Sequence, residues 1–378
     1  MATLAVTLFK KSVFAVFTKP QRILPHLKTR GAFYFSGFSK GYANFPHTIY
    51  LGISKTCNLK CSMCDLGQNK NTYYHQHLSP ASELPLKTWM EFIDGISPFK
   101  PAIEFSAAEP LLYSGIKPLI SHIKKKGLKC RIFTNGFLLL EFSRFFNEVG
   151  LNHVIVSVDG TAKVHDAIRG KPGLWDKIVA GLQALRLPGT KTPMIDINMT
   201  ISDENYGIIK ETFEALKAKC SFDRFTVIHT LFTPAEAVKE HNRLYGKFPA
   251  MPICETGVDF SRIDFVKIAT QIEELQKSYP GMIRVYPDFS PKLLETWYRR
   301  PKEKVGNKRC LFIWNSANIT ADGEVIPFMR CAHVSFGNIK DAAFSDIWNN
   351  RQFREFRCLS RKAGLFPICN RCSASLMR

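Results

Sequence analysis

The segment Thr48-Ile-Tyr-Leu-Gly-Ile53 and the loop Cys57-Asn-Leu-Lys-Cys61-Ser-Met-Cys64 behind it decide how this chain folds. The first run is rich in β-branched and aromatic side chains, which is typical of a strand. The loop carries three thiols at the spacing C-x3-C-x2-C, and thiolates are the ligands of iron–sulfur clusters. A zinc ion would need a fourth local ligand, for which His75 and His77 are the nearest candidates. The pattern therefore favours a [4Fe–4S] cluster with one iron left open to a substrate or cofactor.

Short apolar runs alternate with longer amphipathic segments through the middle of the chain, which predicts an α/β fold built from repeated βα units. The expected strands are 48–53, 102–106, 129–134, 153–158, 194–201 and 224–229. The expected helices are 86–98, 115–126, 138–148, 173–185 and 205–218. Such units form either an open doubly wound sheet or a partial (β/α) barrel, and in both the ligand binds at the carboxyl ends of the strands.

Composition narrows the class of protein. The chain has 378 residues, of which 45% are hydrophobic, so a globular protein is expected and long disorder is excluded. Lys and Arg number 52 against 32 Asp and Glu, a net charge of +20 that favours an anionic partner. The 11 cysteines cluster at short spacings, which suits metal or cluster ligation in a reducing cytosol better than secreted disulfides.

The basic N-terminal segment, residues 1–47, has no carboxylate, and the first one in the chain is Asp65. Apolar residues recur near helical spacing over residues 2–17, around Lys10 and Lys11. Two hypotheses fit: a helix lying in a membrane interface, or a helix packed on the catalytic domain. A spanning helix is not expected because the apolar run is far shorter than the roughly 20 residues that a bilayer needs. A signal peptide is disfavoured, so we expect a cytoplasmic protein with peripheral contact at the inner face of the membrane.

Further motifs stand at the ends of the later expected strands. Phe105-Ser-Ala-Ala-Glu-Pro110 follows the second strand, Thr-Asn135-Gly the third, Ser157-Val-Asp159-Gly the fourth, and Ile-Arg169-Gly the helix after it, while Asn198 lies in the fifth strand. Each motif alone is weak evidence for a binding site, since an Asn-Gly or Asp-Gly pair is often only a turn. In this order behind C-x3-C-x2-C, they resemble the radical S-adenosylmethionine (radical SAM) superfamily over roughly residues 48–230.

The resemblance implies a partial (β/α)6 TIM-like barrel over a core domain of residues 48–300. It implies a [4Fe–4S] cluster on Cys57, Cys61 and Cys64 that binds S-adenosyl-L-methionine (SAM) and takes one electron from a reductant such as flavodoxin or ferredoxin. SAM cleavage would then give a 5′-deoxyadenosyl radical that abstracts hydrogen from the substrate. The implied cofactor-binding residues are Met63, Ala107, Ala108, Glu109, Asn135, Ser157, Asp159, Arg169 and Asn198.

Three of these positions depart from the family pattern. Met63 replaces an aromatic residue, and Ala107 and Ala108 replace the two glycines of a Gly-Gly-Glu-Pro motif. Glycine there lets backbone approach the methionine amino group, so the added methyl groups are expected to displace the loop slightly.

A second set of cysteines follows Pro301, with expected strands at 311–320 and 324–328 around an Asp322-Gly323 hairpin. Its members are Cys310, Cys331, Cys369 and Cys372. A zinc ribbon or buried cysteines would also fit. The stretch resembles the SPASM and shorter Twitch extensions of radical SAM enzymes, which implies one auxiliary [4Fe–4S] cluster in a small α+β domain, residues 301–378. The region has fewer than the seven cysteines that a full SPASM domain uses for two auxiliary clusters. Cys358 is an alternative ligand.

Three cysteines lie outside both sets. Cys130, which begins a strand, and Cys220, which ends a helix, are expected to be small buried apolar residues. Cys254 lies in the Pro-rich connection 248–255, near the expected barrel mouth. Some radical SAM epimerases use such a thiol as a hydrogen donor, so Cys254 is a candidate catalytic residue, with a structural cysteine as the alternative.

The expected function is hydrogen abstraction from a polar small molecule, anionic or lipid-linked, ending in oxidation or epimerisation. Radical modification of a peptide is the alternative, although peptide-modifying relatives often carry a larger N-terminal recognition domain. A nucleic-acid partner would suit the charge of +20, but the chain has no recognised RNA-binding motif such as an RRM signature, so that class is disfavoured.

Overall fold

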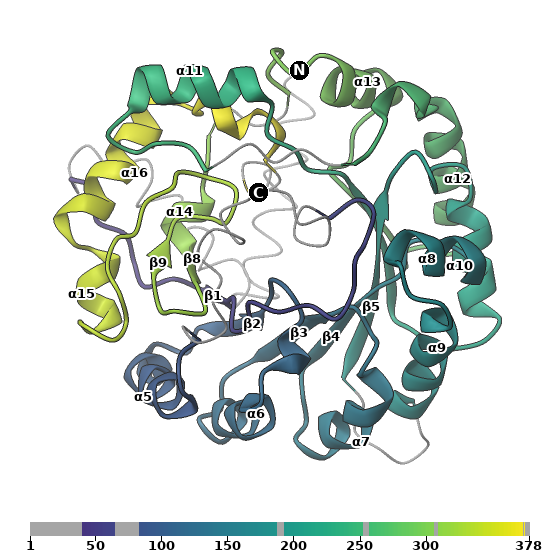
Figure 1. The fold of residues 1–378 in the computed structure, drawn as a ribbon, viewed down its shortest axis with the longest axis horizontal. Coiled ribbons are helices and arrows are strands. Elements are labelled where there is room, and N and C mark those ends of the chain that lie inside the picture. Colours follow the sequence, from purple (N-terminus) through teal and green to yellow (C-terminus); the bar gives the residue numbers. More distant parts are fainter. Residues whose placement is uncertain are drawn as a thin grey trace, which may run out of the picture.

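A computed structural model describes residues 40–64, 83–186, 193–251, 257–305, 309–372 and 374. A strongly curved sheet of nine strands runs through them in the order β7-β6-β5-β4-β3-β2-β1-β8-β9 (Figure 1). All neighbours pair in parallel except β8 and β9. The sheet does not close, because β7 and β9 are its two edges. The fold is therefore an α/β partial barrel.

All six strands expected from the sequence are present, and β7 continues the series. The strands are β1 Thr48–Leu51, β2 Ala102–Phe105, β3 Cys130–Thr134, β4 His153–Ser157, β5 Met194–Ile201, β6 Arg224–His229, β7 Ile283–Tyr286, β8 Ser316–Ile319 and β9 Val325–Ile326.

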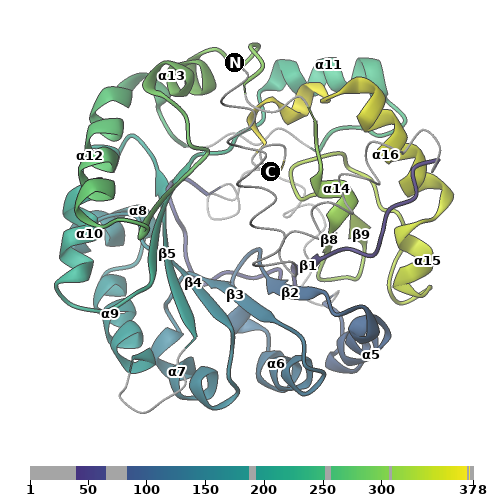
Figure 2. The same ribbon diagram turned by 180° about the vertical axis from the view of Figure 1, so that it is seen from behind.

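Helices cover the convex side of the sheet, where each hides an apolar stripe (Figures 1 and 2). The α-helices are α5 Leu86–Ile96, α6 Ile116–Lys125, α7 Leu139–Glu148, α8 Ala162–Arg169, α9 Leu174–Leu185, α10 Ile209–Lys217, α11 Ala235–Tyr245, α12 Phe265–Ser278, α13 Pro291–Arg299, α14 Phe312–Asn315, α15 Phe344–Trp348 and α16 Arg351–Ala363. Short 3-10 turns are η2 Ser97–Phe99, η3 Pro110–Leu112, η4 Phe260–Arg262 and η5 Pro367–Arg371. In the described part of the chain, no helix combines the length and apolar character needed to cross a bilayer.

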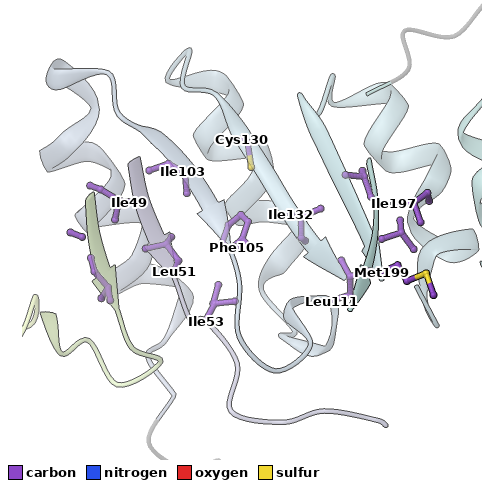
Figure 3. Packing of buried hydrophobic residues seen from close by; sticks show 14 of the residues in the cluster. Ile49, Leu51, Ile53, Ile103, Phe105, Leu111, Cys130, Ile132, Ile197 and Met199 are labelled. Carbon is purple, nitrogen blue, oxygen red and sulfur yellow. The ribbon is translucent and has the colours of Figure 1, made fainter. Parts of the chain in front are cut away.

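The strand side chains alternate between the helix layer and the interior of the curve. Ile49, Leu51, Ile103 and Phe105 are fully buried in the core (Figure 3). Each such side chain contributes about 1.5–3 kcal/mol by leaving water. At alternate, in-register positions, Tyr50 of β1, Glu104 of β2 and Arg131 of β3 form a row across the sheet, in which Arg131 pairs with Glu104 at 2.9 Å. This row is therefore chemically distinct from the apolar core.

The C-terminal region extends the same sheet rather than forming a separate one, since β8 pairs in parallel with β1. The expected division at residue 300/301 stays a prediction. The predicted strand at 311–320 is wrong in its first half, which is helix α14. Phe312, Ile313 and Trp314 are buried in succession in this short helix, and the strand β8 begins only at Ser316. The Asp322-Gly323 hairpin between β8 and β9 is confirmed.

Candidate functional site

The first cysteine loop crosses the carboxyl ends of the strands. It leaves β1 at Gly52, whose N–H donates to the Ile319 carbonyl of β8 at 2.8 Å. Its far end is fixed at Ser62, whose N–H donates to Ile168 of α8 at 2.8 Å and whose hydroxyl donates to Glu204 at 2.7 Å. The loop is therefore anchored on both sides of the concave face, where the sequence predicts the ligand to bind.

The thiols of Cys57, Cys61 and Cys64 lie close enough to act on one another. The pKa of Cys61 is raised to about 11, chiefly by burial. The Arg169 charge opposes this rise, and the charges of Cys64 and Cys57 contribute to it. Burial also raises the pKa of Cys57. In the described residues, no three His, Cys, Asp or Glu side chains converge as a single metal ion requires. A cluster is a larger body, with one thiolate on each bound iron, so this donor set fits a cluster better than a lone ion.

Glu109 is fully buried and holds two strand ends together. Its carboxylate accepts from the Leu111 N–H at 3.1 Å, the Thr134 hydroxyl at 2.9 Å and the Asn135 N–H at 2.7 Å. Burial raises its pKa to about 7, and these three hydrogen bonds oppose that rise. All these contacts are internal, so the contact of Glu109 with SAM stays a prediction, and its visible role is to fix the loops after β2 and β3.

Ala107 and Ala108 both have left-handed backbone, with φ of +68° and +44°. Glycine adopts this region without cost, whereas an L side chain is strained there. The chain thus keeps the conformation that paired glycines would favour, despite its two methyl groups. The sequence signal for this conformation is their place at the two glycine positions of the family motif, not the residue type itself.

Asn135 joins the third strand end to the cysteine loop. Its amide nitrogen donates to the Cys57 sulfur at 3.8 Å and to Asn58 Oδ1 at 2.8 Å. The amide oxygen accepts from the Phe137 N–H at 2.9 Å, which makes the expected turn. Asn135 therefore serves both as a turn residue and as a neighbour of a thiol.

Asp159 and Arg169 form a buried ion pair beneath the loop. Asp159 is fully buried and accepts from the Thr200 N–H at 2.8 Å, while its own N–H donates to His165 Nδ1 at 3.0 Å. Arg169 also donates to the Cys61 sulfur at 3.8 Å. The guanidinium thus links a buried carboxylate to a thiol.

The other expected cofactor positions lie nearby. Ser157 and Asn198 are register partners on β4 and β5, and both are half-buried. Met63 is half-buried in the cysteine loop and packs against the core. Their roles toward SAM stay predictions.

The second cysteine set also converges. Charges on Cys331, Cys372 and Cys310 all raise the pKa of Cys369, after burial as the largest cause. Cys358 lies on α16, as expected, beside Arg357. Cys130 is fully buried at the start of β3, as predicted, whereas Cys220 follows α10 and is half-buried. Four buried or half-buried thiols that influence one another's charge fit an auxiliary cluster held entirely by the protein.

Arg371, between Cys369 and Cys372, was not singled out by the sequence. It is almost fully buried, and its guanidinium donates to five main-chain carbonyls. They belong to Thr296, Trp297, Arg300, Glu303 and Asn370. Its position inside the C-x2-C motif is the signal that could have found it.

The two cysteine sets are joined through the connection that holds Cys254. Met251 N–H donates to the Cys331 carbonyl at 2.8 Å. A Cβ added to Gly257 would lie 2.6 Å from the Ser62 carbonyl oxygen. Cys254 itself lies outside the described residues.

Comparison with known proteins identifies the chain. Residues 51–216 match the family model described as the radical SAM superfamily, and residues 310–373 match the SPASM model, an iron–sulfur cluster-binding domain. The chain belongs to the radical SAM superfamily. It is an enzyme whose cofactors are SAM, the [4Fe–4S] cluster that binds SAM, and an auxiliary cluster in the SPASM domain.

Named relatives span most of the chain. An Fe-coproporphyrin III synthase of Methanosarcina barkeri is 26% identical and covers 80% of this chain and 73% of the relative. An AdoMet-dependent heme synthase from the same organism is 26% identical, over 86% of this chain and 89% of the relative. SuiB of Streptococcus suis with bound S-adenosylmethionine has the same fold, with a TM-score of 0.59 at 17% identity over 97% of this chain and 84% of SuiB.

Proposed function

We propose that this enzyme abstracts hydrogen from a polar, anionic small molecule, and that a carboxylated tetrapyrrole is the substrate class to test first. The observation that carries the proposal is the short connection from Met251, bonded to Cys331, to Gly257, packed on Ser62. It supports a substrate site flanked by both cysteine sets. The proposed ligands are Cys57, Cys61 and Cys64 for the first cluster and Cys310, Cys331, Cys369 and Cys372 for the second.

When bound, the clusters and SAM supply the one-electron chemistry, and the chain's own residues position them and exclude water. Asn135 and Arg169 hold donors against two thiols, at 3.8 Å each. Such hydrogen bonds to sulfur orient a ligand and tune its potential. Glu109 keeps the loops after β2 and β3 in fixed relation.

The substrate class is supported by charge and by relatives. A net charge of +20 suits a carboxylated substrate. Relatives at 22–26% identity are named for Fe-coproporphyrin III, heme and pre-heme d1. A lipid-linked anion and a peptide are the competing classes.

Substrate-dependent SAM cleavage tests the proposal. The anaerobically reconstituted enzyme is given SAM, dithionite and iron coproporphyrin III, and 5′-deoxyadenosine is measured by mass spectrometry. We expect its formation to rise about tenfold over the substrate-free rate, equivalent to about 1.4 kcal/mol of barrier. The uncharged tetramethyl ester is the matched control and should not stimulate. Stimulation by a short peptide but not by the porphyrin would overturn the proposal in favour of peptide modification.

The fate of the substrate radical depends on Cys254. We propose oxidation, in which the radical loses one electron to the auxiliary cluster and one proton, so the product is two hydrogens poorer per SAM consumed. In this case Cys254→Ala keeps activity. If Cys254 instead donates hydrogen, the product mass in ordinary water is unchanged, and deuterium oxide adds one deuterium that does not exchange. Deuterium incorporation that vanishes in Cys254→Ala would decide for epimerisation.

We also propose that the basic N-terminal segment is a peripheral membrane anchor, because it joins apolar residues at helical spacing to basic charge without a carboxylate. Each basic residue near an anionic bilayer contributes about 1 kcal/mol. Deletion of residues 1–30 should therefore release the protein from anionic vesicles in low-salt sedimentation while leaving its iron content unchanged. Equal sedimentation of both forms would contradict the anchor and favour a segment packed on the core.

A further inference from the structure

We infer that three lysines beside the first cysteine loop form the docking surface for a small acidic electron carrier of the flavodoxin or ferredoxin type. This lysine patch consists of Lys171 and Lys177, whose Nζ atoms lie over the ring of Phe137, and of Lys60, whose main chain packs on Gly170 beside Lys171. The inference rests on the proposed ligand role of the first cysteine set, and adds to it the place where the electron enters.

The patch is drawn from three separate segments. Lys177, on α9, places its Nζ 4.3 Å from the centroid of the Phe137 ring. Lys171, in the α8–α9 connection, places its Nζ 5.2 Å from the same centroid. Lys60 comes from the cysteine loop, and its carbonyl oxygen lies 3.0 Å from the position of a Cβ on Gly170. The fold therefore brings these cations together.

Their charge is directed to solvent rather than to carboxylates of the protein. All three lysines are exposed, and in the described part of the chain none forms an ion pair. The exposed carboxylates of the flanking helices, Glu141 and Asp176, do not pair with them. An exposed cationic patch around an aromatic ring steers and fits an acidic protein partner.

The patch lies on a short path to the thiols. Phe137 N–H donates to the Asn135 side chain at 2.9 Å, and Asn135 donates to the Cys57 sulfur at 3.8 Å. Lys60 itself stands between Cys57 and Cys61 in the loop. In the electron transfer that we infer, the reduced carrier loses one electron and the oxidised cluster gains it, with no bond broken and no proton moved. Closeness to the thiols matters for electron transfer but not for binding to lipid, so it favours an electron carrier over a membrane as the partner.

Stopped-flow reduction of the reconstituted holoenzyme tests the docking surface. The variant Lys171→Glu/Lys177→Glu is compared with Lys217→Glu/Lys277→Glu, which makes the same change in charge. Lys217, whose Nζ lies 5.6 Å from the Phe222 centroid, ends α10, and Lys277 is in the last turn of α12. Both helices lead into the amino ends of strands, so the control lies at the opposite edge of the sheet. Reduced flavodoxin and dithionite are the two electron sources, and bleaching of the cluster absorbance is the readout.

We expect the patch variant to lose about tenfold in second-order rate with flavodoxin at low salt, and to approach the wild type at high salt. The control variant, the rate with dithionite and the iron content should not change. Asp176→Asn, which removes a nearby negative charge, should speed reduction by flavodoxin. Equal rates for patch and control variants, or an equal loss with dithionite, would overturn the inference. Loss of binding to anionic vesicles with an unchanged flavodoxin rate would reassign the patch to a membrane.

Discussion

Ala107 and Ala108 store backbone strain beside the proposed SAM site. A left-handed L residue costs roughly 1–2 kcal/mol, and glycine at the same position avoids that cost while making the unfolded chain more flexible. Strain of this kind persists where surrounding contacts hold it, as the internal bonds of Glu109 do here.

Ala108→Gly should therefore stabilise the protein by up to about 1 kcal/mol and leave SAM cleavage intact or improved. Anaerobic urea unfolding and 5′-deoxyadenosine production check the two parts. The matched control is Ala215→Gly, inside helix α10, which should destabilise by about 0.5–1 kcal/mol. If Ala108→Gly destabilises as the control does, or abolishes SAM binding, the alignment of this loop with the family motif is wrong.

His165 couples folding to pH. Its Nδ1 accepts the Asp159 N–H at 3.0 Å, so that nitrogen must be unprotonated. Burial, followed by the Arg169 charge, lowers its pKa to about 3 from the ordinary 6.5. A depressed histidine pKa stabilises the folded state fully above pH 6.5, and this stabilisation is lost as the pH falls toward about 3.

Replacing His165 with Asn keeps an acceptor but removes the titrating group. Below about pH 6, the wild type should lose about 1.4 kcal/mol more per pH unit than His165→Asn in its free energy of unfolding. Urea titrations between about pH 7 and about pH 5 measure the difference. Parallel pH profiles for the two proteins would show that His165 does not titrate on unfolding.

At the scale of elements, Arg371 ties the auxiliary cysteine motif to the end of a helix. Arg371 bonds the carbonyls of Thr296 and Trp297 near the end of α13 and of the following Arg300, and the Thr296 carbonyl also accepts from the Arg300 N–H at 3.1 Å. A cation there is also favoured by the helix dipole. The C-x2-C motif is thereby fixed to the barrel.

Arg371→Lys keeps the charge but cannot satisfy five carbonyls, and each unsatisfied buried group costs about 1–3 kcal/mol. We expect lower auxiliary iron and an altered auxiliary EPR signal, with the SAM-binding cluster unchanged. Arg144→Lys, exposed on α7, is the control. An auxiliary signal identical to that of the wild type would refute this role.

Elements that carry a repeating pattern were predictable, and single contacts were not. The strands β1 to β6 follow from β-branched runs. The first cysteine set is grouped by its spacing and the second by its resemblance to the SPASM extension, and their roles as ligands stay predictions. The helix α14 was missed because Phe312, Ile313 and Trp314 have strand-like composition, and a helix of 4 residues is too short to show the helical period. Four of the five carbonyls that Arg371 bonds lie 68 to 75 positions away in sequence. The left-handed backbone of Ala107 and Ala108 is indicated only by the glycine positions of the family motif. Such features depend on tertiary packing.

At the scale of the whole molecule, one continuous sheet carries both cysteine sets. β1, which leads into the first set, has β2 on one side and β8, which follows Cys310, on the other. Strand pairing therefore links the first set to the Cys310 end of the second, while Arg371 bonds its Cys369–Cys372 end to α13. We therefore expect this protein to hold two clusters on one rigid frame.

The most direct test of that claim is iron and acid-labile sulfide analysis after anaerobic reconstitution, with EPR of the reduced protein. Two [4Fe–4S] clusters hold eight irons and eight sulfides, so we expect about eight of each per chain. Cys57→Ala/Cys61→Ala/Cys64→Ala should halve both values and abolish SAM cleavage, while keeping the auxiliary signal. Zinc in place of iron, or a wild-type value of about four that the triple variant retains, would contradict it.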